Sequence, residues 1–195
     1  VSLRGSREAT DVAIYNKIDS HGPLRGPRND NLVGWQEGKK INKNKLLQAL
    51  GLPQAEKVPL FGMVSRIAEQ KGFDILLPVL EILLSSRDIR VIILGTGDPG
   101  LEDRIKKIEV RFRDKLKFIT RFDEALAHLI YSGSDFFLVP SRFEPSGLTQ
   151  LVAMRYGTLP IVRKTGGLSA SVEDGKTGFV FEEYTSEALL KKLEE

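Results

Sequence analysis

Residues that could bind a phosphorylated ligand recur at regular places in this sequence. Arginine grips phosphate through a planar fork, lysine adds a point charge, and glycine lets a backbone approach a ligand closely. Such residues follow the apolar segments at 58–64, 89–95, 115–119, 135–140 and 159–163. In chain order they are Ser65, Arg66 and Lys71; Gly95, Gly97 and Asp98; Arg121 and Phe122; Ser141, Arg142 and Glu144; and Thr165, Gly166 and Gly167.

Glu144 lies just before a predicted helix at 147–157, and no partner for its carboxylate is obvious. The free N–H groups at a helix start suit a phosphate, and Ser146 or Thr149 could add a hydroxyl. Phosphate repels a carboxylate, so Glu144 must face something else, such as sugar hydroxyls or a developing positive charge. Glycoside hydrolysis usually needs two carboxylates. The interpretation is therefore a site for a diphosphate linked to a sugar.

Strand-like and helix-like segments alternate from Val58 onward. A sixth strand is predicted at 177–181, and helices are predicted at 73–86, 101–112, 123–134, 147–157 and 187–193, the last capped by Thr185. Continuous apolar strands alternating with helices predict an α/β fold, in which a parallel sheet carries helices on both faces. Ligands bind at the carboxyl ends of such strands, so the polar groups should meet at one edge.

Residues 1–56 lack the alternation of strand-like and helix-like segments that is seen in residues 57–195. The stretch "SHGPLRGPRNDN" is loop-like, and one helix is predicted near 44–50, ended by Gly51 and Pro53. The basic run "GKKINKNK", with Lys39, Lys40, Lys43 and Lys45, is interpreted as a solvated face at the start of a helix. We interpret 1–56 as an entry segment or linker and 57–195 as the ligand-binding domain.

Composition excludes several classes of function. The 195 residues suit one domain, and 41% hydrophobic and 28% charged residues are ordinary for a globular protein. The sequence has no cysteine and two histidines, so neither a disulfide nor a metal site is expected, and a reducing compartment is favoured. The net charge of +3 is too mild for a nucleic-acid partner. No apolar run reaches the roughly 20 residues of a membrane span. "GTGD" lacks the third glycine of the dinucleotide fingerprint, which argues against an NAD enzyme.

Four stretches resemble one known family. They are "SRIAEQKGFDIL", "LGTGD", "ALAHLIYSGSDFFLVPSRFEPSGLTQLVAMRYGTLPIVRKTGGLSASV" and "GKTGFVF". They are similar to the C-terminal domain of bacterial glycogen synthase and plant starch synthase, over about Gly38 to Leu190. The resemblance implies the Rossmann-like, nucleotide-sugar-binding half of a two-domain GT-B glycosyltransferase. It implies retaining transfer of glucose from ADP-glucose to the non-reducing end of an α-1,4-glucan, without a metal or other cofactor. It also implies an N-terminal catalytic domain that this chain lacks, without which the chain should be inactive, and a cytoplasmic location, or a plastid in a plant.

The resemblance also implies roles for individual residues. Arg66 and Lys71 would neutralise the diphosphate and stabilise the departing ADP, and Glu144 would face the donor glucose. The donor-binding set implied by the resemblance is Phe122 against the base, Leu148 and Thr149 on the phosphates, and Gly166 and Gly167 near sugar and phosphate. Gly95 and Gly97 are added to this set because glycines after a strand let the backbone approach a ligand.

Some positions depart from the wider pattern. Val152 stands where the broader group of such transferases has a second glutamate, which favours the narrower synthase assignment. Ser146 replaces a cysteine common in the family, and the stretch around Lys17 matches the family's N-G-I-D loop only loosely. Two alternatives stay open: a related retaining transferase using UDP-glucose or another nucleotide sugar, and a non-catalytic nucleotide- or glucan-binding module.

Overall fold

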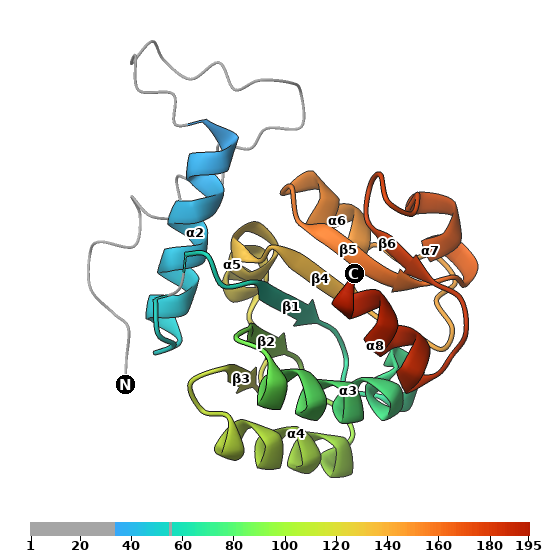
Figure 1. The fold of residues 1–195 in the computed structure, drawn as a ribbon, viewed down its shortest axis with the longest axis horizontal. Helices are drawn as coiled ribbons and strands as arrows, with labels where there is room; N and C mark the ends of the chain where they lie inside the picture. Colours follow the sequence, from blue (N-terminus) through green and yellow to red (C-terminus); the bar gives the residue numbers. More distant parts are fainter. Residues whose placement is uncertain (1–33, 55) are drawn as a thin grey trace. The chain divides into compact units, whose positions relative to one another are not determined.

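The computed structural model describes residues 34–54 and 56–195, drawn as a coloured ribbon in Figure 1. The predicted loop at 20–31 lies outside the described residues. Packing divides the chain into two compact units, Val1–Trp35 and Gln36–Glu195, and the fold described below belongs to the second. No helix among the described residues is long and apolar enough to cross a membrane.

The described residues form a parallel sheet. Its strands are β1 (Leu60–Val64), β2 (Arg90–Leu94), β3 (Leu116–Ile119), β4 (Phe136–Val139), β5 (Leu159–Arg163) and β6 (Phe179–Phe181). Their order across the sheet is β3-β2-β1-β4-β5-β6, and every neighbouring pair is parallel. This is the strand order of a doubly wound, Rossmann-like sheet. The predicted α/β fold class is therefore confirmed.

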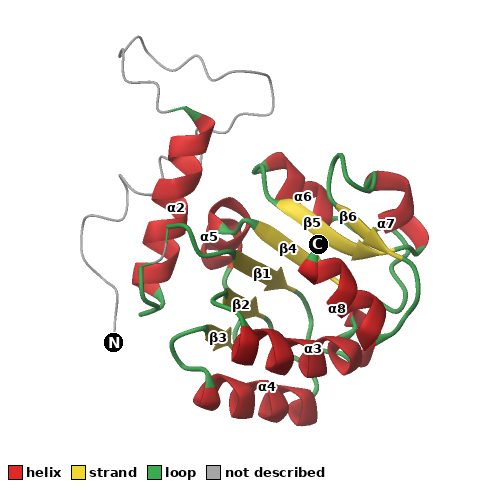
Figure 2. Cartoon of the chain, viewed as in Figure 1, coloured by secondary structure: helices red, strands yellow, loops and turns green. Residues whose placement is uncertain are grey.

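Helices cover both faces of the sheet, as Figure 2 shows. The helices α3 (Phe73–Ser86), α4 (Pro99–Arg111) and α8 (Ser186–Glu194) share one buried apolar cluster. The helices α2 (Trp35–Ala49), α5 (Glu124–Gly133), α6 (Thr149–Arg155) and α7 (Gly166–Ser171) share the other. Side chains alternate along each strand, so Phe61 and Met63 enter the first cluster while Leu60 enters the second.

Local signals explain where several helices begin. The carboxylates of Asp98 and Asp123 accept hydrogen bonds from backbone N–H groups in the first turns of α4 and α5. Thr185 caps α8, as predicted, by accepting from the N–H of Ala188 at 3.1 Å. Pro78 lies on the exposed side of α3 without ending it. These caps fix the start of each helix against the strand before it.

The helix α2 differs from its prediction in length and in surroundings. It begins at Trp35 rather than near Asn44, and its Leu46 and Leu47 are fully buried in the apolar cluster that holds α5 and α6. The predicted domain boundary at residue 57 therefore falls within the compact unit that begins at Gln36. Propensity alone does not reveal this packing, since the helix is polar on average and only two leucines in its second half reach the core.

The prediction that the basic run is a solvated face is wrong for two of its lysines. Lys43 is 4% exposed, and its Nζ donates to Asp135 Oδ2 at 2.6 Å and to the carbonyls of Glu56 and Val58. Lys39 donates to Thr158 Oγ1 at 2.6 Å, and burial lowers the pKa of Lys39 to about 8. The reason is tertiary: Asp135 and the carbonyls satisfy a charge that would otherwise need water.

We expect Lys43→Met to destabilise the domain by about 2 to 3 kcal/mol, because it leaves the Asp135 carboxylate and two carbonyls without their shared donor. Asp135 is 33% exposed, so the loss should fall short of that for a fully buried pair. The control is Lys40→Met, which removes an exposed pair with Glu56 and should change stability by under about 0.5 kcal/mol. Urea unfolding measures both changes, and equal losses would contradict the account.

Candidate functional site

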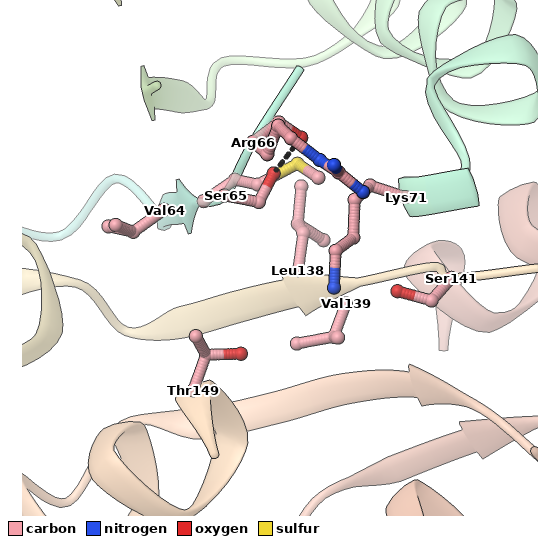
Figure 3. Close-up of a pocket in the computed structure, with 9 residues that line it drawn as sticks. Val64, Ser65, Arg66, Lys71, Leu138, Val139, Ser141 and Thr149 are labelled. Atoms are coloured by element: carbon pink, nitrogen blue, oxygen red, sulfur yellow. Dashed lines mark hydrogen bonds between the residues drawn. The ribbon is translucent and has the colours of Figure 1, made fainter. Parts of the chain in front are cut away.

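A pocket opens where the strand order reverses, between β1 and β4. The chain leaves β1 toward α3 on one face and leaves β4 toward α6 on the other, so a crevice remains at the carboxyl ends of the two strands. The pocket, whose lining residues are drawn in Figure 3, has a volume of about 190 Å³. It is lined by Met63, Val64, Ser65, Arg66, Lys71, Leu138, Val139, Ser141 and Thr149.

The structure brings together residues from two of the predicted strand ends at this pocket, those of β1 and β4. Arg66 and Lys71 come from the segment after β1, Ser141 from the segment after β4, and Thr149 from the start of α6 (Figure 3). Arg66 is exposed, whereas the Lys71 side chain is 22% exposed. Two cations and three hydroxyls therefore border a small space, and its apolar lining comes from Met63, Val64, Leu138 and Val139.

Lys71 and Glu144 form an ion pair beside the pocket. The Lys71 Nζ donates to Glu144 Oε2, and Ser141 Oγ lies 3.4 Å from the same oxygen. The Glu144 side chain is only 14% exposed. The sequence does not indicate this ion pair, because its two residues lie 73 positions apart. The pair neutralises the carboxylate, so an anion at Lys71 would not meet an uncompensated negative charge.

The segment after β1 is tied to the segment after β4. Gly72 has φ of 83°, and a Cβ there would overlap the carbonyl of Pro140, so only glycine permits this approach. The Gln70 amide donates to the Phe143 carbonyl at 3.1 Å, and the Arg142 N–H donates to the Gln70 carbonyl at 2.9 Å. These contacts place Lys71 against Glu144.

Gly95 and Gly97 do not line the pocket. The N–H of Gly95 donates to the Ile119 carbonyl at 3.0 Å, and that of Gly97 donates to the Glu102 carboxylate at 2.8 Å. A Cβ on either glycine would overlap a backbone carbonyl of Ser65 or Ile67. In this structure the two glycines therefore allow the backbone after β1 to pack closely against them. Their contact with a ligand stays a prediction. The same hydrogen bond from Gly97, with one from Thr96, lowers the pKa of Glu102.

Gly166 and Gly167 contact the backbone that carries Glu144. The N–H of Gly167 donates to the carbonyls of Glu144 and Pro145, at 3.1 and 3.2 Å. A Cβ on Gly166 would overlap the carbonyl of Glu144. These glycines begin a short helix, α7, that was not predicted. Glycine is a poor helix former, so no local signal indicated it.

Phe122 and Leu148 lie outside the pocket lining, with exposures of 90% and 70%. Phe122 follows β3 and precedes α5, so it lies at the same edge of the sheet as the pocket, toward the β3 side. Arg121, its neighbour, is paired with Asp123 at 2.8 Å. The exposed Phe122 ring is therefore available to a ligand, while Thr149 is the member of the Leu148–Thr149 pair that reaches the pocket.

Comparison with known proteins identifies the class. The sequence profile of the family "Glycosyl transferases group 1" matches residues 46–195. The chain belongs to this family of glycosyltransferases.

Within that family the chain is similar to glycogen and starch synthases. It is 45% identical to the glycogen synthase of Bacillus subtilis over 200 residues, which cover 96% of this chain and 41% of that protein. It is 40% identical to that of Mycoplasma mobile over 198 residues, covering 98% of this chain and 41% of that protein. The chain thus spans about two fifths of the length of these relatives. The resemblance inferred from the sequence is confirmed.

Solved structures agree. The catalytic domain of starch synthase IV from Arabidopsis thaliana, bound to ADP and acarbose, superposes with a TM-score of 0.78 at 34% identity, over 94% of this chain and 39% of that chain. Anabaena HepE in complex with UDP and glucose is less similar, with a TM-score of 0.62 at 25% identity, over 77% of this chain and 41% of that chain.

We expect Gly72→Ala to destabilise the domain by roughly 2 kcal/mol more than Gly51→Ala. Both glycines have positive φ, 83° and 66°, so alanine is strained by about 1 to 2 kcal/mol at either position. Only at position 72 would the new Cβ also overlap a backbone carbonyl, that of Pro140, whereas Gly51 faces open space. Urea unfolding of the two variants measures the difference. Equal losses would show that the approach of the two segments is not tightly constrained.

Proposed function

We propose that this chain is the donor-binding domain of a retaining glucosyltransferase that transfers glucose from ADP-glucose to the non-reducing end of an α-1,4-glucan. The observation that carries the proposal is the pocket between β1 and β4, which is bordered by Arg66 and by Lys71, whose Nζ pairs with Glu144. The similarity to curated glycogen synthases and to an ADP-bound starch synthase supports the choice of donor. A cytoplasmic location is part of the proposal and is supported by the cysteine-free sequence.

The two cations would stabilise the leaving diphosphate. In the transfer, the bond between glucose C1 and the phosphate oxygen breaks while C1 forms a bond to a hydroxyl oxygen of the glucan, which gives up its proton. Negative charge grows on the nucleoside diphosphate as it leaves. Arg66 and Lys71 would stabilise that charge where it develops, and these two cations would do so without a metal ion. Thr149 and Ser141 would add hydroxyl hydrogen bonds to phosphate oxygens.

Glu144 would face the glucose rather than the phosphates. Its pairing with Lys71 places one positive charge between the carboxylate and the diphosphate, so the two anions can share the site. A carboxylate at that point can accept hydrogen bonds from sugar hydroxyls and stabilise positive charge at the anomeric carbon. Phe122, at the β3 side of the same edge, would stack on the base.

Titration calorimetry of the chain with ADP, ADP-glucose, UDP-glucose and maltooligosaccharides tests this proposal. We expect Lys71→Ala to weaken the affinity for ADP by about tenfold or more. The affinity for adenosine should change by under about twofold, because the lost contact is to the phosphates. Added salt should weaken ADP in the same direction by screening.

The control is Lys107→Ala, which removes the same charge from an exposed pair with Asp103 and should leave ADP binding unchanged. Tighter binding of UDP-glucose than of ADP-glucose would support the related transferase instead. If the chain bound maltooligosaccharides but none of the nucleotides, that result would support a glucan-binding module. Equal loss of ADP and adenosine in Lys71→Ala would place the phosphates elsewhere.

We expect the chain by itself to bind donor but to transfer no glucose. It spans about two fifths of its relatives, and an uncovered donor faces water, which competes for the glucose. Contacts that bind the phosphates equally in ground and transition states do not raise turnover. Incubation with radiolabelled ADP-glucose and glycogen measures transfer, with the Bacillus subtilis glycogen synthase as positive control. Label entering glycogen with this chain alone would refute the expectation.

A further inference from the structure

The segment that carries Glu144 is irregular, yet each of its backbone carbonyls accepts a hydrogen bond. Arg163 Nε donates to the Ser141 carbonyl at 3.0 Å, and Arg163 Nη2 donates to the Arg142 carbonyl. The carbonyl of Phe143 accepts from Gln70, and those of Glu144 and Pro145 accept from the Gly167 N–H. The whole stretch 141–145 is therefore held by donors from three other parts of the fold.

Arg163 is the charged donor of this set. It ends β5, directly beside the end of β4, and its planar guanidinium spans two consecutive carbonyls in the way that suits a rigid fork. Ser141, which it holds, is fully buried, and the Ser141 hydroxyl approaches the Glu144 carboxylate at 3.4 Å. A shift of the Ser141 backbone would therefore be passed directly to Glu144.

The Arg163 guanidinium is itself held in place. It lies over the Tyr184 ring, 5.4 Å from the ring centre, and the Arg142 guanidinium lies over the same ring at 4.8 Å. The Tyr184 hydroxyl donates to Asp74, whose other oxygen accepts from Arg142 at 3.0 Å. Tyr184 and Asp74 thus connect the segment after β4 to α3 and to the segment after β6.

We propose that Arg163 is a positioning residue for Glu144: through the Ser141 and Arg142 carbonyls it sets where the carboxylate meets the donor sugar. The proposal rests on the function proposed above, in which Glu144 faces glucose. Arg163 does not line the pocket, so its influence on the donor runs through the backbone that it holds. Lysine at this position would keep the charge but lose the fork that reaches two carbonyls.

The test compares Arg163→Lys with Arg111→Lys. Arg111 also makes an ion pair, with Glu81 at 3.2 Å, and also lies over an aromatic ring, that of Phe112, but it is on α4 away from Glu144. Calorimetry measures ADP and ADP-glucose affinities for each variant. We expect Arg163→Lys to weaken ADP-glucose by roughly tenfold and ADP by under about twofold, since charge-assisted hydrogen bonds contribute at this level. Arg111→Lys should change neither.

A double-mutant cycle with Glu144→Gln separates positioning from general damage to the fold. If Arg163 acts through Glu144, Arg163→Lys should weaken ADP-glucose by under about twofold when Glu144 is already glutamine. Additive losses in the double variant would overturn the proposal. So would an equal loss of ADP and ADP-glucose affinity in Arg163→Lys.

Amide hydrogen exchange provides a readout that does not depend on any ligand. In Arg163→Lys we expect faster exchange at residues 142–147, including the Arg142 N–H that donates to Gln70, and unchanged exchange in α4. Unchanged exchange at 142–147 would overturn the inference even if donor binding changed. If the unaltered chain bound no nucleotide, the proposed function would fail, and the exchange comparison would still decide whether Arg163 holds this segment.

Discussion

The reversal of strand order between β1 and β4 determines where this domain can bind a ligand. Parallel strands with helices on both faces leave no opening within the layers, because each strand continues into a helix packed against the sheet. Only where the two neighbouring connections leave toward opposite faces does a crevice remain. The pocket there is lined by Arg66, Lys71, Ser141 and Thr149, because each lies in the segment that follows β1 or β4 or opens the next helix.

The pairing of Lys71 with Glu144 explains how groups of opposite charge can lie close together in this crevice. A diphosphate requires cations, and a sugar with a developing positive charge favours a carboxylate. The lysine between them contacts the carboxylate and borders the pocket, so neither charge is left isolated at 22% and 14% exposure. The backbone around the pair is fixed from outside the pocket, by Gly72 against Pro140 and by donors to the carbonyls of 141–145. Rigidity in this irregular segment thus comes from hydrogen bonds to the main chain rather than from regular structure.

The sheet could be predicted from the sequence because its signals are local. The run Val91–Leu94 is apolar throughout and is buried on both faces, and α3 was predicted with both ends as observed. The ion pairs could not be predicted in this way. Lys43 and Asp135 are 92 positions apart, and the sequence around Lys43 predicts a solvated helix face because it does not indicate this pairing. Likewise, the type and place of Gly95 and Gly167 indicate that something approaches closely. They do not tell whether that is a ligand or another loop, and in the structure neighbouring backbone occupies the space.

A crystal structure of the chain with ADP-glucose would test the central claim most directly. The account predicts the diphosphate between Arg66 and Lys71, the glucose beside Glu144 and the adenine against Phe122. It also predicts that Ser141 to Pro145 keep their backbone position, because their carbonyls are already bound. Phosphates away from Lys71, or a donor bound instead in the groove of about 270 Å³ between α3 and α4, lined by Leu77, Pro78, Glu81, Arg104, Lys107 and Ile108, would contradict it.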